Sequence, residues 1–127
     1  MGNYVAVQLI KKMRKKKIKI KGAKILIMGL TFKENCTDLR NSGIQGVIRK
    51  LRKFKCNISL HDPWANNIEI KKKYGIFPKT KFVNNTYDAV LVAVAHKNFK
   101  KLGFQNILKL CKKTSVIYDL KYLFRSS

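Results

Sequence analysis

Short apolar runs alternate with stretches of helical periodicity along the 127-residue chain. A short apolar run that ends in a turn signal predicts a buried strand, whereas apolar side chains at a spacing of three and four predict a helix. Strands are expected at residues 24–30, 56–60, 89–95 and 115–120, with a short edge strand at 81–83. Helices are expected at residues 1–17, 42–54, 66–74 and 99–111, the last broken at Gly103.

This alternation predicts an α/β fold. Strand–helix–strand units give a parallel sheet with right-handed crossovers. We expect a Rossmann-like parallel sheet of four to five strands in the order 3-2-1-4-5, with helices on both faces and preceded by an N-terminal helix. The first strand is followed by Gly29-Leu30-Thr31-Phe32-Lys33 and not by GxGxxG, so a dinucleotide phosphate loop of its own is not expected.

The stretch from Lys24 to Gly43, KILIMGLTFKENCTDLRNSG, passes from an apolar strand into a charged loop. Asn41 or Ser42 can cap the helix that follows. In open α/β sheets ligands bind at the carboxyl ends of the strands, where this loop lies. Asp38 and Arg40 carry opposite charges beside Lys33, which favours a site for a charged ligand.

The chain has only six acidic residues, and their positions are informative. Glu34 and Asp38 follow the first strand, Asp62 follows the second, and Asp119 ends the last strand. These positions share one edge of the expected sheet. Asp is also a common turn residue, and for Asp62 the turn-forming role and the site role have about equal weight.

The basic residues give the chain a net charge of +23. Such an excess can mark a protein that binds nucleic acid or a membrane surface. Lysine, isoleucine and asparagine are all frequent, as in proteins of AT-rich genomes, and the lysines are spread along the whole chain. A binding footprint should cluster on one face, so we favour compositional bias over a nucleic-acid partner. The apolar runs are too short to cross a bilayer, and no membrane partner is expected.

The three cysteines, Cys36, Cys56 and Cys111, form neither a CxxC pair nor a zinc pattern. Reduced thiols in a cytoplasmic protein are expected, with no metal site. Cys36 lies in the charged loop without a neighbouring histidine, so we assign it a structural role.

One segment resembles a known family. The run ILIMGLTFKENCTDLRNSGI resembles the start of the C-terminal domain of the nucleotide-sugar 6-dehydrogenases, which include UDP-glucose, UDP-N-acetylhexosamine and GDP-mannose dehydrogenases. The Ala-His-Lys stretch most resembles the N-acetylhexosamine branch. Four further features agree in order: His61-Asp62-Pro63, Asp88-Ala89-Val90, Ala93-Val94-Ala95-His96 with Phe99, and Asp119-Leu120-Lys121.

The resemblance implies an oxidation of the sugar C6 alcohol to a carboxylate, with NAD as the cofactor, for polysaccharide precursor synthesis. Phe32 and Lys33 match residues that line the nucleotide-sugar site, and Lys121 matches a basic residue near the sugar nucleotide. Arg40 matches a residue that reaches toward NAD. Lysine suits a phosphate or a developing carboxylate, and Asp38, Asp62 and Asp119 would support the site.

The resemblance also implies a division of the chain. Residues 1–20 correspond to the end of the family's central helix, and residues 21–127 to its C-terminal UDP-sugar-binding domain. The family's nucleophilic cysteine and NAD-binding domain have no counterpart here, so we expect a truncated, inactive part of an enzyme. Its partners would be a UDP-sugar and the missing N-terminal domain, in a homo-oligomeric full enzyme. The alternatives are a basic nucleic-acid-binding module and a non-functional remnant.

Overall fold

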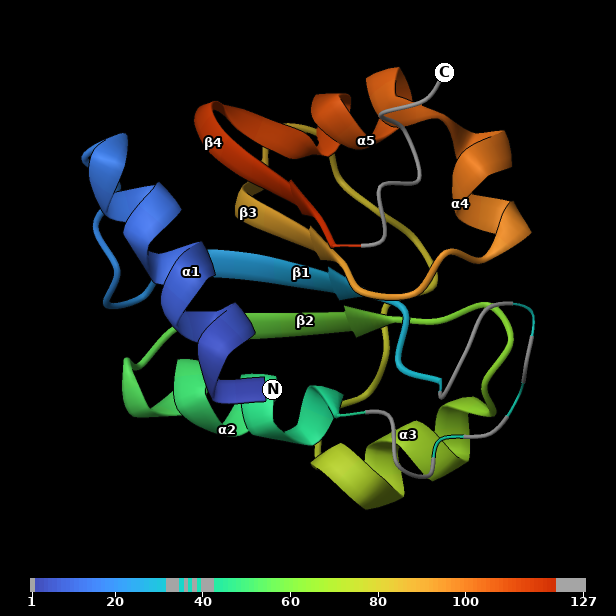
Figure 1. The fold of residues 1–127 in the computed structure, drawn as a ribbon. Coiled ribbons are helices and arrows are strands. Elements are labelled where there is room, and N and C mark those ends of the chain that lie inside the picture. Colours follow the sequence, from blue (N-terminus) through green and yellow to red (C-terminus); the bar gives the residue numbers. More distant parts are fainter. Residues whose placement is uncertain (1, 32–34, 36, 38, 40–42, 121–127) are drawn as a thin grey trace.

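In the computed structural model, which describes residues 2–31, 35, 37, 39 and 43–120, helices cover both faces of a parallel sheet (Figure 1). The elements follow the expected alternation of strands and helices. In chain order they are α1 (Gly2–Lys15), β1 (Lys24–Met28), α2 (Ile44–Lys53), β2 (Asn57–His61), α3 (Asn67–Tyr74), β3 (Tyr87–Val92), α4 (Lys97–Leu102), α5 (Phe104–Leu110) and β4 (Cys111–Asp119).

The sheet has four strands in the order β2-β1-β3-β4, and all neighbours are parallel. Met28 pairs with both His61 and Val92, and Val92 pairs with Asp119. The carboxyl ends of all four strands therefore lie at one edge of the sheet. The predicted fold class is confirmed, and the strand order is the predicted one without its short edge strand.

The predicted edge strand at residues 81–83 is absent from the structure, which shows no regular element there. The segment approaches β2 through one backbone hydrogen bond, in which the N–H of Lys79 donates to the carbonyl of Leu60 at 2.7 Å. Val83 is 72% exposed. Phe82 packs against the second core cluster, so the run buries one side chain without pairing as a strand.

Helix α2 begins after Gly43, which adopts a φ of 76° at the N-cap without a side-chain capping bond. The prediction that Asn41 or Ser42 caps this helix is wrong, because Gly43 occupies the cap position. Asn41 and Ser42 lie outside the described part of the chain. Glycine reaches this left-handed conformation without steric cost, so a backbone turn starts the helix. By contrast, α3 has a side-chain cap, because Asn66 accepts from the N–H groups of Ile68 and Glu69.

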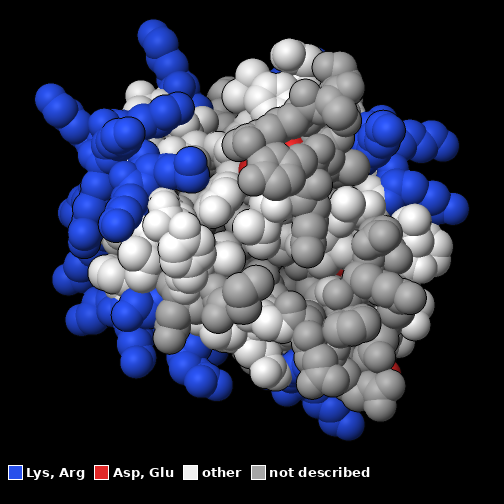
Figure 2. Space-filling view, viewed as in Figure 1, with Lys and Arg blue, Asp and Glu red and all other residues white. Residues whose placement is uncertain are grey.

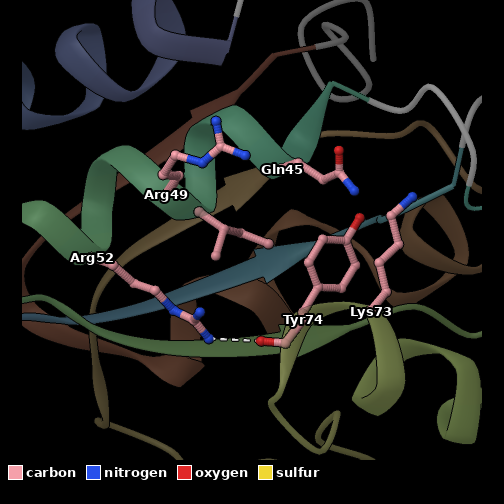
Figure 3. Close-up of a pocket in the computed structure, with 6 residues that line it drawn as sticks. Gln45, Arg49, Arg52, Lys73 and Tyr74 are labelled. Atoms are coloured by element: carbon pink, nitrogen blue, oxygen red, sulfur yellow. Dashed lines mark hydrogen bonds between the residues drawn. The ribbon is translucent and has the colours of Figure 1, made fainter.

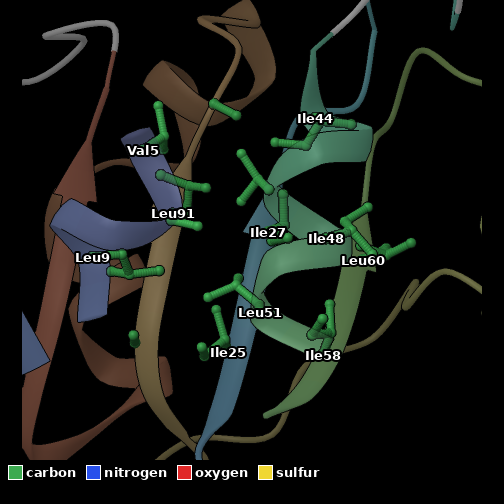
Figure 4. Close-up of a cluster of buried hydrophobic side chains, with 14 of the residues drawn as sticks. Val5, Leu9, Ile25, Ile27, Ile44, Ile48, Leu51, Ile58, Leu60 and Leu91 are labelled. Carbon is green, nitrogen blue, oxygen red and sulfur yellow. The ribbon is translucent and has the colours of Figure 1, made fainter. Parts of the chain in front are cut away.

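The main core lies between one face of the sheet and the helices that cover it, α1, α2 and α3 (Figure 4). Helix α1 belongs to this core, since it packs against α2 and β4. A second cluster lies on the other face beneath α4 and α5, around Leu26, Val90 and Phe99. Within the part of the chain that is described, no helix is both long and apolar enough to cross a bilayer.

Gly29 permits the close approach of two chain segments at the carboxyl edge. It follows β1 with a φ of 101°, and a Cβ atom at this position would lie 2.7 Å from both the backbone nitrogen and the Cβ of Val94. Both the backbone conformation and the contact exclude a larger residue. Only glycine lets the end of β1 pass directly beside the segment that follows β3.

We expect Gly29→Ala to lower the free energy of unfolding by more than about 2 kcal/mol, because left-handed strain and a backbone clash add. Gly22→Ala is the matched control. Gly22 also has a positive φ, of 80°, but an added Cβ would meet no atom within 4 Å, so about 1–2 kcal/mol of strain is its whole cost. Urea unfolding of both variants measures the difference, and equal losses would show that the Val94 contact is unimportant.

Candidate functional site

The predicted site residues that the structure describes lie at the carboxyl edge of the sheet. Asp62 directly follows β2, and Asp119 is the last residue of β4, half-buried. The remaining predicted site residues lie outside the described residues: Phe32, Lys33, Asp38, Arg40 and Lys121. Most of these predicted residues belong to the loop after β1, and the described contacts at this edge show what holds Thr31, Asn35 and Leu39 of that loop.

Asp62 is buried, with 3% of its surface exposed, and its carboxylate accepts four backbone hydrogen bonds. Oδ2 accepts from the N–H of Leu30 at 2.7 Å and of Thr31 at 3.2 Å. Oδ1 accepts from the N–H of Trp64 at 2.8 Å and of Ala65 at 3.2 Å. One side chain thus joins the segment after β1 to the turn after β2.

The surroundings of Asp62 keep its carboxylate ionised. Burial alone would raise the pKa of Asp62, but hydrogen bonds from His96 and from the backbone of Leu30 and Trp64 outweigh burial and hold the pKa below its ordinary value. The folded pKa is therefore lower than the unfolded one. Ionised Asp62 stabilises the fold at neutral pH, and this stability is lost only as the pH falls through the ordinary carboxyl range, below about 4.

His96 is completely buried and connects Asp62 to the loop after β1. Its Nε2 lies 3.0 Å from Asp62 Oδ2 and 3.1 Å from Thr31 Oγ1. Its Nδ1 accepts from the N–H of Asn35 at 2.9 Å. Because Nδ1 accepts, the ring is neutral and carries its proton on Nε2, which donates to the carboxylate. The side chain of Asn35 adds a second contact, since its Oδ1 accepts from the N–H of Lys97 at 3.0 Å.

The loop after β1 is consequently held at three described points. Asp62 binds the backbone of Thr31, His96 binds that of Asn35, and Lys73 donates through Nζ to the carbonyl of Leu39 at 2.6 Å. His96 belongs to the family resemblance, but no role was predicted for it. A histidine directly after a buried strand was the available signal, but its partners are 34, 61 and 65 residues away in the chain.

Two hollows lie near this edge. One, of about 320 Å³, opens at the end of β2 beside His61, Asp62, Lys79 and Thr80. Burial lowers the pKa of His61, and its Nδ1 donates to the carbonyl of Lys79 at 2.8 Å, so this ring is neutral at pH 7. The His61 side chain that lines this hollow is therefore held by a hydrogen bond within the protein.

The other hollow, of about 250 Å³, lies between α2 and α3 and is lined by basic and polar side chains (Figure 3). Two of its cations bind backbone carbonyls: Arg52 donates to the carbonyl of Tyr74 at 2.7 Å, and Lys73 donates to that of Leu39. Figure 3 shows the Arg49 guanidinium directed away from the Tyr74 ring. The Arg52 hydrogen bond thus connects α2 to α3, and the cations that line the hollow do not converge on one point.

The described cysteines are thiols and not activated nucleophiles. Burial raises the pKa of Cys56 and of Cys111, and their sulfurs face the carbonyls of Ile20 and Ile107. Cys36 lies outside the described residues. Among residues 2–31, 35, 37, 39 and 43–120, no group of three or more His, Cys, Asp or Glu side chains could hold a metal ion.

Comparison with known proteins identifies the chain's relatives. Residues 26–126 match the UDP-glucose/GDP-mannose dehydrogenase family, UDP binding domain. A UDP-N-acetyl-D-glucosamine 6-dehydrogenase of Salmonella typhi is 46% identical over 123 residues, which cover 97% of this chain and 29% of that protein. The corresponding enzyme of Pseudomonas aeruginosa shows the same identity and coverage.

A solved structure of a UDP-N-acetyl-mannosamine dehydrogenase from S. aureus has a TM-score of 0.72 and 25% identity, and it covers 100% of this chain and 28% of the other. The chain thus spans less than a third of the length of these relatives.

Two substitutions of His96 separate its two contacts. We expect His96→Asn to keep an acceptor for the N–H of Asn35 and to lose the donor to Asp62, whereas His96→Gln keeps that donor and loses the acceptor. Each change should lower the free energy of unfolding by about 1–3 kcal/mol, because one buried hydrogen bond is lost. Amide hydrogen exchange distinguishes the variants: the Asn35 amide should exchange faster in His96→Gln than in His96→Asn. Equal exchange at Asn35 in the two variants would show that His96 does not hold the loop.

Proposed function

The chain belongs to the UDP-glucose/GDP-mannose dehydrogenase family, and from this we propose that it is the UDP-sugar-binding part of an NAD-dependent nucleotide-sugar 6-dehydrogenase. The relatives at 46% identity are UDP-N-acetyl-D-glucosamine 6-dehydrogenases, which supports a UDP-N-acetylhexosamine as the substrate. The product would be the corresponding uronic acid, a precursor for polysaccharides. NAD accepts the hydride in this oxidation.

The observation that carries this proposal is the set of hydrogen bonds that hold Thr31, Asn35 and Leu39 at the carboxyl edge. Ligands of open α/β sheets bind where loops leave the carboxyl ends of the strands. Here the loop after β1 is tied to two other strand ends through Asp62 and His96. Positioning a loop in advance reduces the entropy that ligand binding would otherwise cost. A charged loop held in this way suits a charged ligand such as a nucleoside diphosphate.

The roles of individual residues complete the proposal. Phe32 and Lys33 would line the UDP-sugar site, with Lys121 approaching from the end of the last strand. Lys33 and Lys121 would neutralise the diphosphate or the carboxylate that forms. Arg40 would face the NAD side, and Asp38 and Asp119 would support the site. For Asp62 the support is positional, since its oxygens bind backbone N–H groups.

Catalysis would require a partner. The nucleophilic cysteine and the NAD-binding domain of the family would come from an N-terminal domain, and the full enzyme would be a homo-oligomer in the cytoplasm. The raised pKa values of the Cys56 and Cys111 thiols support this division, because a thiol with a raised pKa is a poor nucleophile.

We expect Lys33→Ala to weaken UDP binding by roughly 1.5–3 kcal/mol, about 10- to 150-fold, because a charge-assisted bond is lost. The thermal melt should stay nearly unchanged. Lys72→Ala is the control, an exposed lysine on α3, and it should bind UDP as the wild type does. Calorimetric titration with UDP measures both. Unchanged affinity in Lys33→Ala, or a loss explained by a lowered melt, would remove Lys33 from the site.

The isolated chain should produce no NADH from UDP-N-acetylglucosamine and NAD, because the nucleophile and the hydride acceptor site would lie on another domain. The absorbance of NADH at saturating substrate measures this directly, with a full-length relative such as the Salmonella typhi enzyme as the positive control. Turnover by the purified chain would contradict the proposed division of labour.

A further inference from the structure

Lysines gather at the amino edge of the sheet, opposite the carboxyl edge. Helices α1 and α2 both end at this side with basic last turns, and the turns that follow them lead into β1 and β2. The backbone joins the two turns, since the N–H of Gly22 donates to the carbonyl of Lys55 at 2.8 Å. The amino-edge lysines, all exposed, are Lys15, Lys16, Lys17, Lys19, Lys21, Lys24, Lys53, Lys55, Lys112 and Lys113.

Figure 2 shows these charges as a dense band of basic side chains on the left of the molecule, where Figure 1 places the end of α1, the start of β1 and the end of α2. The spread of the lysines along the sequence favoured compositional bias as their explanation. Folding brings three separate segments, residues 15–24, 53–55 and 112–113, to one side.

Little negative charge opposes this band. Among the described residues of this edge, the carboxylate is that of Asp88, whose side chain is 14% exposed. It accepts from the N–H of Lys24 at 2.8 Å and pairs with Lys112 at 3.2 Å, so it is already bound within the protein. The other amino-edge lysines repel one another, and an external anion would relieve that repulsion.

We propose that the amino edge docks on the surface of an anionic phospholipid bilayer. The contact is electrostatic and superficial, so it requires none of the long apolar segments whose absence led to the expectation of no membrane partner. Each lysine close to an anionic leaflet contributes about fivefold to the partition coefficient, and lysines farther than a Debye length of about 10 Å contribute little. A cluster on one edge therefore matters more than the total charge.

The composition of the edge favours a bilayer over nucleic acid or a protein. The edge is mainly lysine, with Arg14 and Arg52 as the arginines of the last turns of α1 and α2. Lysine acts as a point charge, whereas phosphate groups of nucleic acids are often read by arginine forks. Single-stranded nucleic acid also requires exposed rings for stacking. Of the aromatic rings near this edge, Tyr87 is buried and Phe54 is half-buried, with Arg14 and Lys50 each 5.8 Å from the Phe54 centroid.

Large exposed apolar side chains, which typically anchor a protein interface, are few at the described edge. Tyr4, Ile68, Phe77 and Phe104 lie elsewhere, whereas Val83 and Leu108 lie near the amino ends of β3 and β4, beside the band. Docking through the amino edge would leave the carboxyl edge facing away from the membrane.

The test uses two variants with equal net charge. The edge variant carries Lys15→Gln, Lys19→Gln, Lys21→Gln and Lys53→Gln, and the control carries Lys72→Gln, Lys81→Gln, Lys100→Gln and Lys101→Gln. All eight lysines are exposed. Sedimentation with vesicles of equimolar phosphatidylserine and phosphatidylcholine measures the partition coefficient, beside vesicles of phosphatidylcholine alone and a duplex RNA competitor. Thermal melts of both variants verify that they fold.

We expect the edge variant to lose more than about 100-fold in partitioning onto anionic vesicles and the control less than about tenfold. Vesicles of phosphatidylcholine alone should bind neither protein. Equal losses in the two variants would attribute binding to net charge and overturn the proposal. RNA that displaces the chain at a phosphate concentration far below that of the lipid would assign the edge to nucleic acid instead. UDP titration of the edge variant is an independent measurement, so failure of UDP binding leaves this result intact.

Discussion

The carboxylate of Asp62 is the constraint on which the candidate site depends. A buried charge is costly unless hydrogen bonds replace its hydration, and Asp62 receives them from four backbone N–H groups and from His96. These groups come from three segments, after β1, β2 and β3. The site edge is therefore organised by one side chain that touches no solvent, while most of the residues expected to meet the ligand are carried by the loop after β1.

Gly29 and His96 show how the same edge is built from contacts that are remote in sequence. Gly29 lets β1 end beside the segment after β3, and that segment then delivers His96 to Asp62. His96 in turn fixes Asn35, which adopts a left-handed φ of 55°. The strain of that conformation is balanced because both the backbone N–H and the side-chain oxygen of Asn35 are bonded. Packing at Gly29 and hydrogen bonding at His96 together hold Thr31 and Asn35 at this edge.

The parts of the fold that follow from local patterns were predictable. The apolar run at residues 89–95 predicted a buried strand, which the structure has at Tyr87–Val92, and the alternation with helices predicted the parallel sheet. The prediction of an edge strand at 81–83 was wrong. A sequence pattern suggests which side chains are buried, but the neighbouring elements decide it. The predicted cap of α2 by Asn41 or Ser42 was wrong because Gly43 takes the cap position, in a backbone conformation that glycine adopts without steric cost. At the site, the acid after β2 was found, but its dependence on His96 was not, since a pairing across 34 residues leaves no periodic signal.

Charge shows the same limit from the opposite direction. A net charge of +23 is visible in the sequence, yet its distribution in space is not, because the lysines of residues 15–24, 53–55 and 112–113 become neighbours only through the parallel sheet. The parallel connections bring the ends of α1, α2 and α5 to the amino side of β1, β2 and β4, so the basic last turns of α1 and α2 add to the basic starts of β1 and β4. Of the acidic residues that the structure describes, Asp62 lies at the carboxyl edge, and Asp88 at the amino edge is already hydrogen-bonded within the protein. The topology that collects the ligand loops at one edge therefore also collects the positive charge at the other, and the two surfaces can act without interfering with each other.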